Sequence, residues 1–257
     1  MKVTVCEFQN DTEGFEADWE QLATHVRQTR SQLVLLPEMP FYTWLASTPQ
    51  LDPAVWEAAV NAHDRWQDRL GDLSPAMVAG TRPVTRSDRR INEGFIYTAD
   101  TGYVTVHEKY YLPNEDGFWE SSWYHRGDRQ FDVVQAGPAA VGFLICTEQW
   151  FGEHARSYGK QGAHLVLCPR ATPAPSTDKW LSGGQTVAVV SGAFCLSSNR
   201  GGIDAGGMNW GGTGWIVEPQ EGVVLALTDR DHPFKTVDID LSVAERARKT
   251  YPRYVEE

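Results

Sequence analysis

The run AAVGFLIC, from Ala139 to Cys146, is the longest apolar stretch in the chain. It has the length of a β-strand and is far shorter than the roughly 20 apolar residues of a membrane-spanning helix. The polar residues Thr147 and Glu148 follow it, and a helical pattern begins near Gly152. A continuous apolar strand that leads into a helix is typical of strands buried on both faces in α/β proteins. This stretch therefore predicts an α/β fold.

The same alternation of β and α patterns runs along the whole chain. Strands are predicted at residues 2–9, 33–36, 76–80, 91–98, 103–107, 131–134, 139–145, 164–168, 193–198, 214–217, 222–227 and 236–240. Helices are predicted at 12–30, 53–73, 152–161, 177–190 and 241–248, and an irregular segment at 108–129. No linker or repeat interrupts the pattern, so residues 1–257 are predicted to form a single domain whose helices cover the faces of a sheet.

Composition narrows the class of protein. The chain has 257 residues, of which 41% are apolar and ten are tryptophan, so it can bury a large core. Its formal net charge of −11 argues against binding to nucleic acid or to anionic lipid. The N-terminus begins directly with a strand pattern, and the four cysteines form no CxxC pair. We therefore expect a cytoplasmic protein with free thiols and no membrane segment.

Three predicted strands end in residues that can do chemistry. Leu33–Leu36 is followed by Pro37 and Glu38, the strand at 103–107 leads to Lys109, and the apolar run ends at Cys146. In open α/β sheets, functional groups gather where strands end. Each residue alone has a more ordinary interpretation, namely a solvated glutamate, a surface lysine and a core cysteine. Together their chemistry is complementary. A thiol needs a base, a buried carboxylate is a stronger base, and an ammonium stabilises an oxyanion.

These segments resemble the nitrilase superfamily of carbon–nitrogen hydrolases, whose catalytic set is Glu-Lys-Cys in that chain order. The resemblance covers nearly the whole chain. It rests on Pro37-Glu38, His107–Pro113 and Gly142–Arg156, and on the downstream blocks Gly162–Pro169, Ser198–Gly201 and Gly212–Val217. It implies a four-layer α-β-β-α sandwich of the nitrilase type and assembly into homodimers or larger homo-oligomers.

The resemblance also implies catalytic roles. Cys146 would attack the substrate carbon, and Glu38 would accept the thiol proton and later activate water. Lys109 and the backbone N–H of Thr147 would hold the oxyanion. Glu120 matches a second glutamate of the family, which positions the substrate and supports Lys109; its alternative is a solvated loop carboxylate.

Three further residues are predicted to bind substrate. Thr147 stands where many relatives have an aromatic residue, which leaves space or adds a hydroxyl beside the thiol. Arg170 stands where many relatives have a small or amide residue. It would bind a substrate carboxylate, or it would form a salt bridge with Glu153 or Glu148. Trp119 belongs to an aromatic cluster that is either core or pocket wall.

The predicted reaction is hydrolysis of a small linear amide or N-carbamoyl compound through a cysteine thioester, with release of ammonia. The loop at 112–128 is similar to that of N-carbamoyl amine and amino-acid amidases. Dedicated nitrilases usually place Trp-Glu after the nucleophile, whereas this chain has Thr147-Glu148. The alternatives are a nitrilase acting on a small nitrile, an acyl transferase, or a non-catalytic binding or scaffold protein of the same fold.

No metal or cofactor is predicted. The seven histidines show no HxxxH or HxH spacing, and the chain has neither GxxxxGK[ST] nor GxGxxG. The expected partners are a small-molecule amide or carbamoyl substrate and further copies of the same chain.

Overall fold

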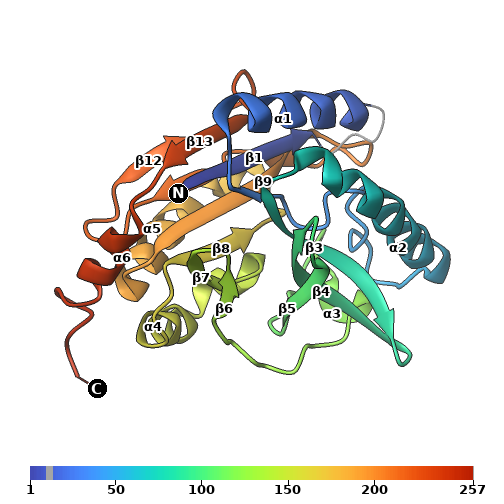
Figure 1. Ribbon diagram of the computed structural model, residues 1–257. Coiled ribbons are helices and arrows are strands. Elements are labelled where there is room, and N and C mark those ends of the chain that lie inside the picture. The colour runs from blue at the N-terminus through green and yellow to red at the C-terminus, as the bar shows by residue number, and fades with distance from the viewer. Residues whose placement is uncertain (10–13, 257) are drawn as a thin grey trace.

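A computed structural model describes residues 1–9 and 14–256. Its strands form one connected sheet whose main path runs in the order β5-β4-β3-β2-β1-β9-β8-β7-β6 (Figure 1). Off this path, β13 pairs with β1, β10 and β11 pair with β9, and β12 pairs with β11. The strands are β1 (Lys2–Gln9), β2 (Leu33–Leu35), β3 (Met77–Arg86), β4 (Arg89–Thr98), β5 (Gly102–Glu108), β6 (Val134–Ala136), β7 (Ala139–Phe143), β8 (Leu165–Pro169), β9 (Phe194–Ile203), β10 (Asn209–Gly211), β11 (Trp215–Val217), β12 (Val224–Leu227) and β13 (Phe234–Asp238).

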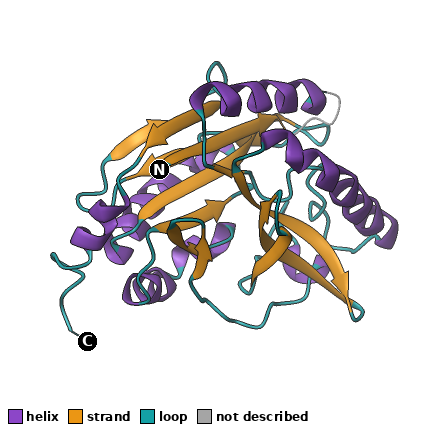
Figure 2. Cartoon of the chain, viewed as in Figure 1, coloured by secondary structure: helices purple, strands orange, loops and turns teal. Residues whose placement is uncertain are grey.

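The helices lie outside this sheet, as the colouring by secondary structure shows (Figure 2). They are α1 (Phe15–Thr29), α2 (Pro53–Gln67), α3 (Glu120–Trp123), α4 (Gly152–Lys160), α5 (Thr177–Ser191) and α6 (Leu241–Ala247), with 3-10 helices η1 (Asp68–Leu73), η2 (Cys146–Trp150) and η3 (Ala174–Ser176). Among the described residues, no helix combines the length and the apolar character needed to cross a bilayer.

The buried residues form apolar cores between four layers of secondary structure. A central apolar core joins the two halves of the sheet, with Val5 and Leu35 from one half and Phe143 and Leu196 from the other. The opposite face of the first half packs against α1, where Trp19 is fully buried. The opposite face of the second half packs against α4 and α5. This arrangement confirms the predicted four-layer α-β-β-α sandwich.

Local sequence explains where the first helices form. In α1 the buried positions are the predicted apolar stripe, Phe15, Trp19, Leu22, Ala23 and Val26. The helix α2 begins after Asp52, whose side chain accepts a hydrogen bond from the backbone N–H of Ala54 at 2.8 Å. Pro53 occupies the first helical position, where it needs no N–H partner. The predicted start of the first helix at residues 12 and 13 lies outside the described residues.

Four strands differ clearly from their predicted limits. The predicted strands at 76–80 and 91–98 continue toward each other as the hairpin β3–β4, which turns at Ser87 and Asp88 with φ of 49° and 60°. The charged residues between them concealed this hairpin. Strand β9 extends to Ile203, beyond the predicted end at 198, because β10 pairs with it. Strand β6 lies at Val134–Ala136, not at 131–134.

Strand direction brings the three predicted chemical residues to one end of the sheet. Strands β1, β2 and β3 are parallel, and the antiparallel steps from β3 to β4 and from β4 to β5 restore that direction in β5. On the other side, β9, β8 and β7 are all parallel to β1. The carboxyl ends of β2, β5 and β7 therefore face the same edge, and these ends precede Glu38, Lys109 and Cys146.

Candidate active site

Lys109 joins two carboxylates in the interior of the protein. Its Nζ donates a hydrogen bond to Oε1 of Glu38 at 2.8 Å and another to Oε1 of Glu120 at 2.8 Å. All three residues are completely buried. The solvated-loop alternative for Glu120 is therefore wrong, because this residue opens the short helix α3 inside the protein.

Hydrogen bonds to the backbone hold the chain segment that contains Glu38. Its backbone carbonyl accepts a hydrogen bond from Nε of Arg200 at 3.1 Å. The next residue, Met39, adopts the left-handed region with φ of 45°, and its N–H donates to Oγ1 of Thr81 at 2.8 Å. Oε1 of the carboxylate also accepts a hydrogen bond from Nδ2 of Asn92 at 2.7 Å. The backbone contacts hold this segment at the end of β2, whereas the hydrogen bond from Asn92 holds the Glu38 carboxylate itself.

Cys146 lies on a strained turn between β7 and η2. Its φ is 49°, a left-handed conformation that costs a non-glycine residue of order 1 kcal/mol or more. The side chain is only 4% exposed, yet it lines a cavity. A nucleophile on such a sharp strand-to-helix turn is presented to substrate together with the backbone N–H groups that follow it.

Burial and the charges around Cys146 determine whether its thiol is protonated. Burial, together with the negative charge of Glu38, raises the pKa of Cys146 to about 12, although Lys109 and a backbone hydrogen bond from Ala171 act in the opposite direction. The thiol is therefore protonated at neutral pH and needs a base to become nucleophilic.

Lys109 and Glu120 influence each other's ionisation. Burial lowers the pKa of Lys109, but the charges of Glu120 and Glu38 outweigh that effect and hold it above its ordinary value. Burial raises the pKa of Glu120 to about 8, against the opposing charge of Lys109 and with the support of the Glu38 charge. The lysine is therefore a permanent cation, as an oxyanion stabiliser must be.

A second buried pair, which the sequence analysis did not single out, fixes the nucleophile turn. Nε2 of His107 lies 2.7 Å from Oε2 of Glu148, and that same oxygen accepts the N–H of Ile145 at 2.8 Å. The other oxygen of Glu148 accepts the N–H of Tyr110 at 2.8 Å. Burial opposes protonation of His107, but the Glu148 carboxylate raises its pKa above the ordinary value. The feature of the sequence that could have indicated this pair is the position of Glu148, two residues after Cys146.

The catalytic cavity has a volume of about 220 Å³ and is lined by Pro113, Glu115, Phe118, Glu120, Cys146, Thr147, Ala171, Thr172, Pro173, Ser176, Lys179 and Trp180. Thr147, the residue after the thiol, lines this cavity, and its contact with substrate stays a prediction. Trp119 is not among the lining residues, and it packs in an aromatic cluster with Trp44 and Trp123. Its contact with substrate stays a prediction.

Arg170 is placed differently from either expectation. Its guanidinium is fully buried and donates to Oγ of Ser197, Oγ1 of Thr172 and the carbonyl of Thr213, at 2.7, 2.7 and 2.8 Å. It stacks 3.8 Å from the ring centroid of Trp215. The alternative salt bridge is wrong, since Glu148 pairs with His107. Burial lowers the pKa of Arg170 to about 9.

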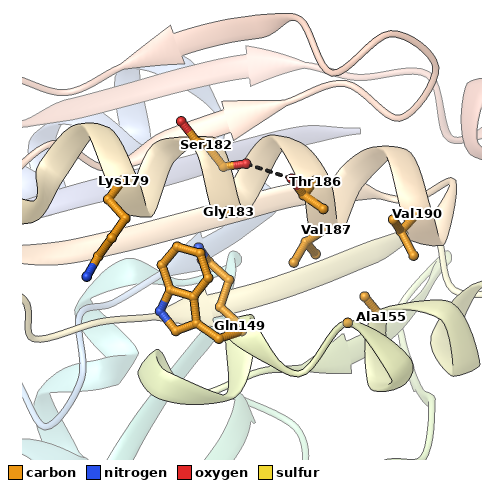
Figure 3. Close-up of a pocket in the computed structure, with 10 residues that line it drawn as sticks. Gln149, Ala155, Lys179, Ser182, Gly183, Thr186, Val187 and Val190 are labelled. Carbon is orange, nitrogen blue, oxygen red and sulfur yellow. Dashed lines mark hydrogen bonds between the residues drawn. The ribbon is translucent and has the colours of Figure 1, made fainter.

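A second cavity of about 360 Å³ lies between α5 and the segment that contains η2 and α4. Figure 3 shows Lys179 at one end of this groove and Val190 at the other, with Gln149 between the two walls. Lys179 lines this groove and the catalytic cavity alike. Across the described part of the chain, no group of three or more His, Cys, Asp or Glu residues could hold a metal ion.

Comparisons with known proteins agree with this geometry. One curated relative is an N-carbamoylputrescine amidase from Arabidopsis thaliana, 27% identical over 61% of this chain; the match spans 57% of that relative's length. A crystal structure of a carbon-nitrogen hydrolase from Helicobacter pylori G27 superposes with a TM-score of 0.87 at 19% identity, covering 98% of this chain and 94% of that one.

Another solved structure is a variant of an amidase from Nesterenkonia sp. AN1, with the acetamide moiety of fluoroacetamide covalently added to its active-site cysteine. Its TM-score is 0.79 at 19% identity, and the match covers 96% of this chain and 92% of that chain. At these identities the two solved structures show the shared fold. The family model for carbon-nitrogen hydrolases matches residues 2–249. The chain therefore belongs to the carbon-nitrogen hydrolase family.

Proposed function

We propose that this protein hydrolyses the C–N bond of a small linear amide or N-carbamoyl compound and releases ammonia. The observation that carries the proposal is the buried Lys109 ammonium between the carboxylates of Glu38 and Glu120, in the cluster that adjoins the Cys146 thiol. A thiol, a base and an oxyanion stabiliser are the groups that acyl transfer through a thioester requires.

The first half of the reaction forms the thioester. Glu38 accepts the proton of the Cys146 thiol while Sγ attacks the carbonyl carbon of the substrate. The C=O π electrons move to oxygen, and the resulting oxyanion is held by Lys109 and by the backbone N–H of Thr147. Glu38 then gives its proton to the departing nitrogen, the C–N bond breaks and ammonia leaves.

The second half regenerates the enzyme. A water molecule takes the place of the ammonia, and Glu38 removes a proton from it as its oxygen attacks the thioester carbon. A second oxyanion forms at the same site and collapses with cleavage of the C–S bond. The proton held by Glu38 returns to the sulfur, and the carboxylic or carbamic acid product departs.

Glu120 supports these steps by holding Lys109 in place. With two carboxylate partners, the Lys109 ammonium cannot swing away from the nucleophile when Glu38 becomes protonated. Glu120 also lines the catalytic cavity, so one of its oxygens can meet the substrate nitrogen. The non-catalytic alternative is disfavoured because burying three ionisable groups is costly to folding unless they are used.

The cavity favours a short substrate. A volume of about 220 Å³ is smaller than the 300–1,000 Å³ typical of drug-sized ligands. Its walls combine apolar side chains, Phe118 and Trp180 among them, with polar ones, and its two exposed charged residues are Glu115 and Lys179. We propose that the scissile group lies at Cys146 and that a polar or charged tail lies toward these two residues.

Ammonia release from a panel of substrates tests the proposal. The panel contains short amides and ureido compounds with neutral, ammonium or carboxylate tails, and nitriles with matching tails. Amide or ureido substrates should release ammonia, and the Cys146→Ala variant should release none while keeping its circular dichroism spectrum. The Cys6→Ala variant is the matched control, because Cys6 is a buried thiol in a different core cluster. Turnover of nitriles alone would contradict the amidase assignment.

Hydroxylamine tests whether the acyl group is transferred to water or to an amine. With hydroxylamine present, a hydrolase should release mainly acid, whereas a dominant hydroxamate product would indicate an acyl transferase.

The homo-oligomer stays a prediction. Light scattering coupled to size-exclusion chromatography should give a mass of at least twice the 28.8 kDa chain.

A further inference from the structure

Asn92 contacts two members of the catalytic set at once. It lies in β4, is completely buried and does not line the catalytic cavity. Its side-chain Nδ2 donates a hydrogen bond to Oε1 of Glu38 at 2.7 Å. Its backbone carbonyl accepts the N–H of Lys109 at 2.9 Å. One residue thus links the end of β2 to the end of β5.

The two oxygens of Glu38 are in different environments. Oε1 accepts hydrogen bonds from both Asn92 and Lys109, the second of which is charge-assisted. Oε2 is buried and has no hydrogen-bond partner among the described residues. An oxygen whose lone pairs are already engaged is a poor proton acceptor, whereas one with free lone pairs is a good one. The proton-accepting capacity of Glu38 is therefore concentrated on Oε2.

We propose that Asn92 is a positioning residue that makes Oε2 of Glu38 the atom that receives the Cys146 proton. The amide fixes the rotation of the carboxylate by hydrogen bonding to Oε1, and Lys109, which follows β5, donates to the same oxygen. This inference rests on the proposed function for the role of Glu38 as base. It assigns Asn92 no contact with substrate, so the residue acts through Glu38.

Packing alone does not explain an amide at this position. Oδ1 of Asn92 is buried without a hydrogen-bond partner among the described residues. A buried amide with an unpaired oxygen is unfavourable for folding compared with an apolar side chain of similar size. The hydrogen bond from Nδ2 to the ionised Glu38 is the interaction that accounts for the amide.

The experiment compares Asn92→Ala and Asn92→Asp with a matched control, Thr81→Val. Thr81 is also fully buried, and its hydroxyl accepts the N–H of Met39, but it does not contact the Glu38 carboxylate. Asn92→Asp nearly preserves side-chain volume and keeps the test available if Asn92→Ala fails to fold. For both Asn92 variants we expect kcat to fall about 10- to 100-fold with KM changed less than about threefold, because the general base is misplaced but still present, and a general base as a whole contributes about 10²–10⁴-fold.

The pH profile separates positioning from structural support. The charged or titratable groups that face Glu38 are Lys109, Glu120, Cys146, Arg200 and Tyr124. In Asn92→Ala the loss of the donor destabilises the ionised carboxylate, and in Asn92→Asp the added negative charge destabilises it further, so the acidic limb of kcat/KM should move to higher pH in both variants and further in Asn92→Asp. Thr81→Val should lower thermal stability without moving this limb. An unmoved limb in both Asn92 variants would overturn the inference.

A substrate-independent measurement distinguishes this inference from the proposed function. The rate of Cys146 alkylation by iodoacetamide, followed by mass spectrometry across pH, also depends on proton transfer to Glu38. Its acidic limb should move upward in Asn92→Asp and stay in place in Thr81→Val. If wild-type protein released no ammonia from any substrate, the proposed function would fail, whereas this alkylation profile would still support or refute the role of Asn92.

Discussion

Nζ of Lys109 lies 2.8 Å from Oε1 of Glu38, and neither side chain reaches solvent. A buried ammonium is stable only with a negative partner, and here the second carboxylate of Glu120 completes the group. The cluster therefore carries more negative than positive charge when all three groups are ionised. This excess explains why burial and the Glu38 charge together raise the pKa of Glu120 to about 8.

Replacement of the lysine should affect both catalysis and folding. Lys109→Met removes the oxyanion stabiliser, so kcat/KM should fall by about 100-fold or more, as for other lost oxyanion donors. It also leaves the buried Glu38 carboxylate without its counter-ion, so the free energy of unfolding should fall by about 3 kcal/mol. Steady-state kinetics and urea denaturation measure the two effects. The exposed Lys249 on the C-terminal side of α6 provides the control Lys249→Met, which should change neither.

The thiol should react with electrophiles only with the help of Glu38. Burial is the largest of the causes that raise the pKa of Cys146 to about 12, so the thiol stays protonated throughout the neutral range even when the Glu38 charge is removed. Glu38→Gln should therefore slow iodoacetamide alkylation of Cys146 at pH 7.5 by about tenfold or more, on the scale of general-base effects. Alkylation of the variant should accelerate toward high pH. Equal rates for the two proteins at pH 7.5 would show a thiolate that forms without the base.

The raised pKa of Glu120 makes stability depend on pH in a defined direction. Between the ordinary carboxyl pKa and about 8, folded Glu120 keeps its proton while the unfolded chain has released it. Unfolding then releases a proton, so this residue's contribution to the free energy of unfolding is present at low pH and is lost as the pH rises toward 8. The glutamine side chain of the Glu120→Gln variant cannot ionise, so this position does not lower the variant's free energy of unfolding as the pH rises.

The measurement is the stability difference between Glu120→Gln and wild type at several pH values. Taking pH 5 as the reference, the difference should move in favour of the variant up to pH 8, by no more than about 5 kcal/mol, and then level off. Glu115→Gln is the control, because Glu115 lines the same cavity but is exposed. A flat difference for Glu120→Gln would contradict a raised pKa.

Arg170 should prove to be a structural residue. Arg170→Lys keeps the positive charge but loses the planar fork that reaches three oxygens and stacks on Trp215. The free energy of unfolding should fall by about 3 kcal/mol, as expected for lost hydrogen bonds of a buried charged group. The KM values for neutral and carboxylate-bearing substrates should change by the same factor. A selective rise in KM for carboxylate-bearing substrates would support direct contact with substrate instead.

The parts of the site that follow from local pattern were predictable. Glu38, Lys109 and Cys146 each end a strand whose apolar run is visible in the sequence, and parallel strands present their ends at a common edge. The buried position of Glu120 was indicated by its aromatic surroundings. The full β3–β4 hairpin was not predicted, because the charged residues Arg82, Arg86 and Arg89 are typical of a loop. In the folded protein, Arg82 and Arg86 form ion pairs with Glu93 on the neighbouring strand.

The remaining features depend on contacts between segments far apart in the chain. Arg170 reads as a potential anion-binding residue, and only the positions of Ser197, Thr213 and Trp215 show that its donors are engaged within the protein. The role inferred for Asn92 likewise depends on the meeting of β4 with the end of β2. The sequence alone predicted an α/β fold and candidates for the nucleophile, base and oxyanion stabiliser, because periodicity and residue type are local properties. Only the tertiary structure decided which oxygen of Glu38 has no hydrogen-bond partner among the described residues and which cations already donate to other protein groups, because hydrogen bonding and desolvation arise from groups that folding brings together.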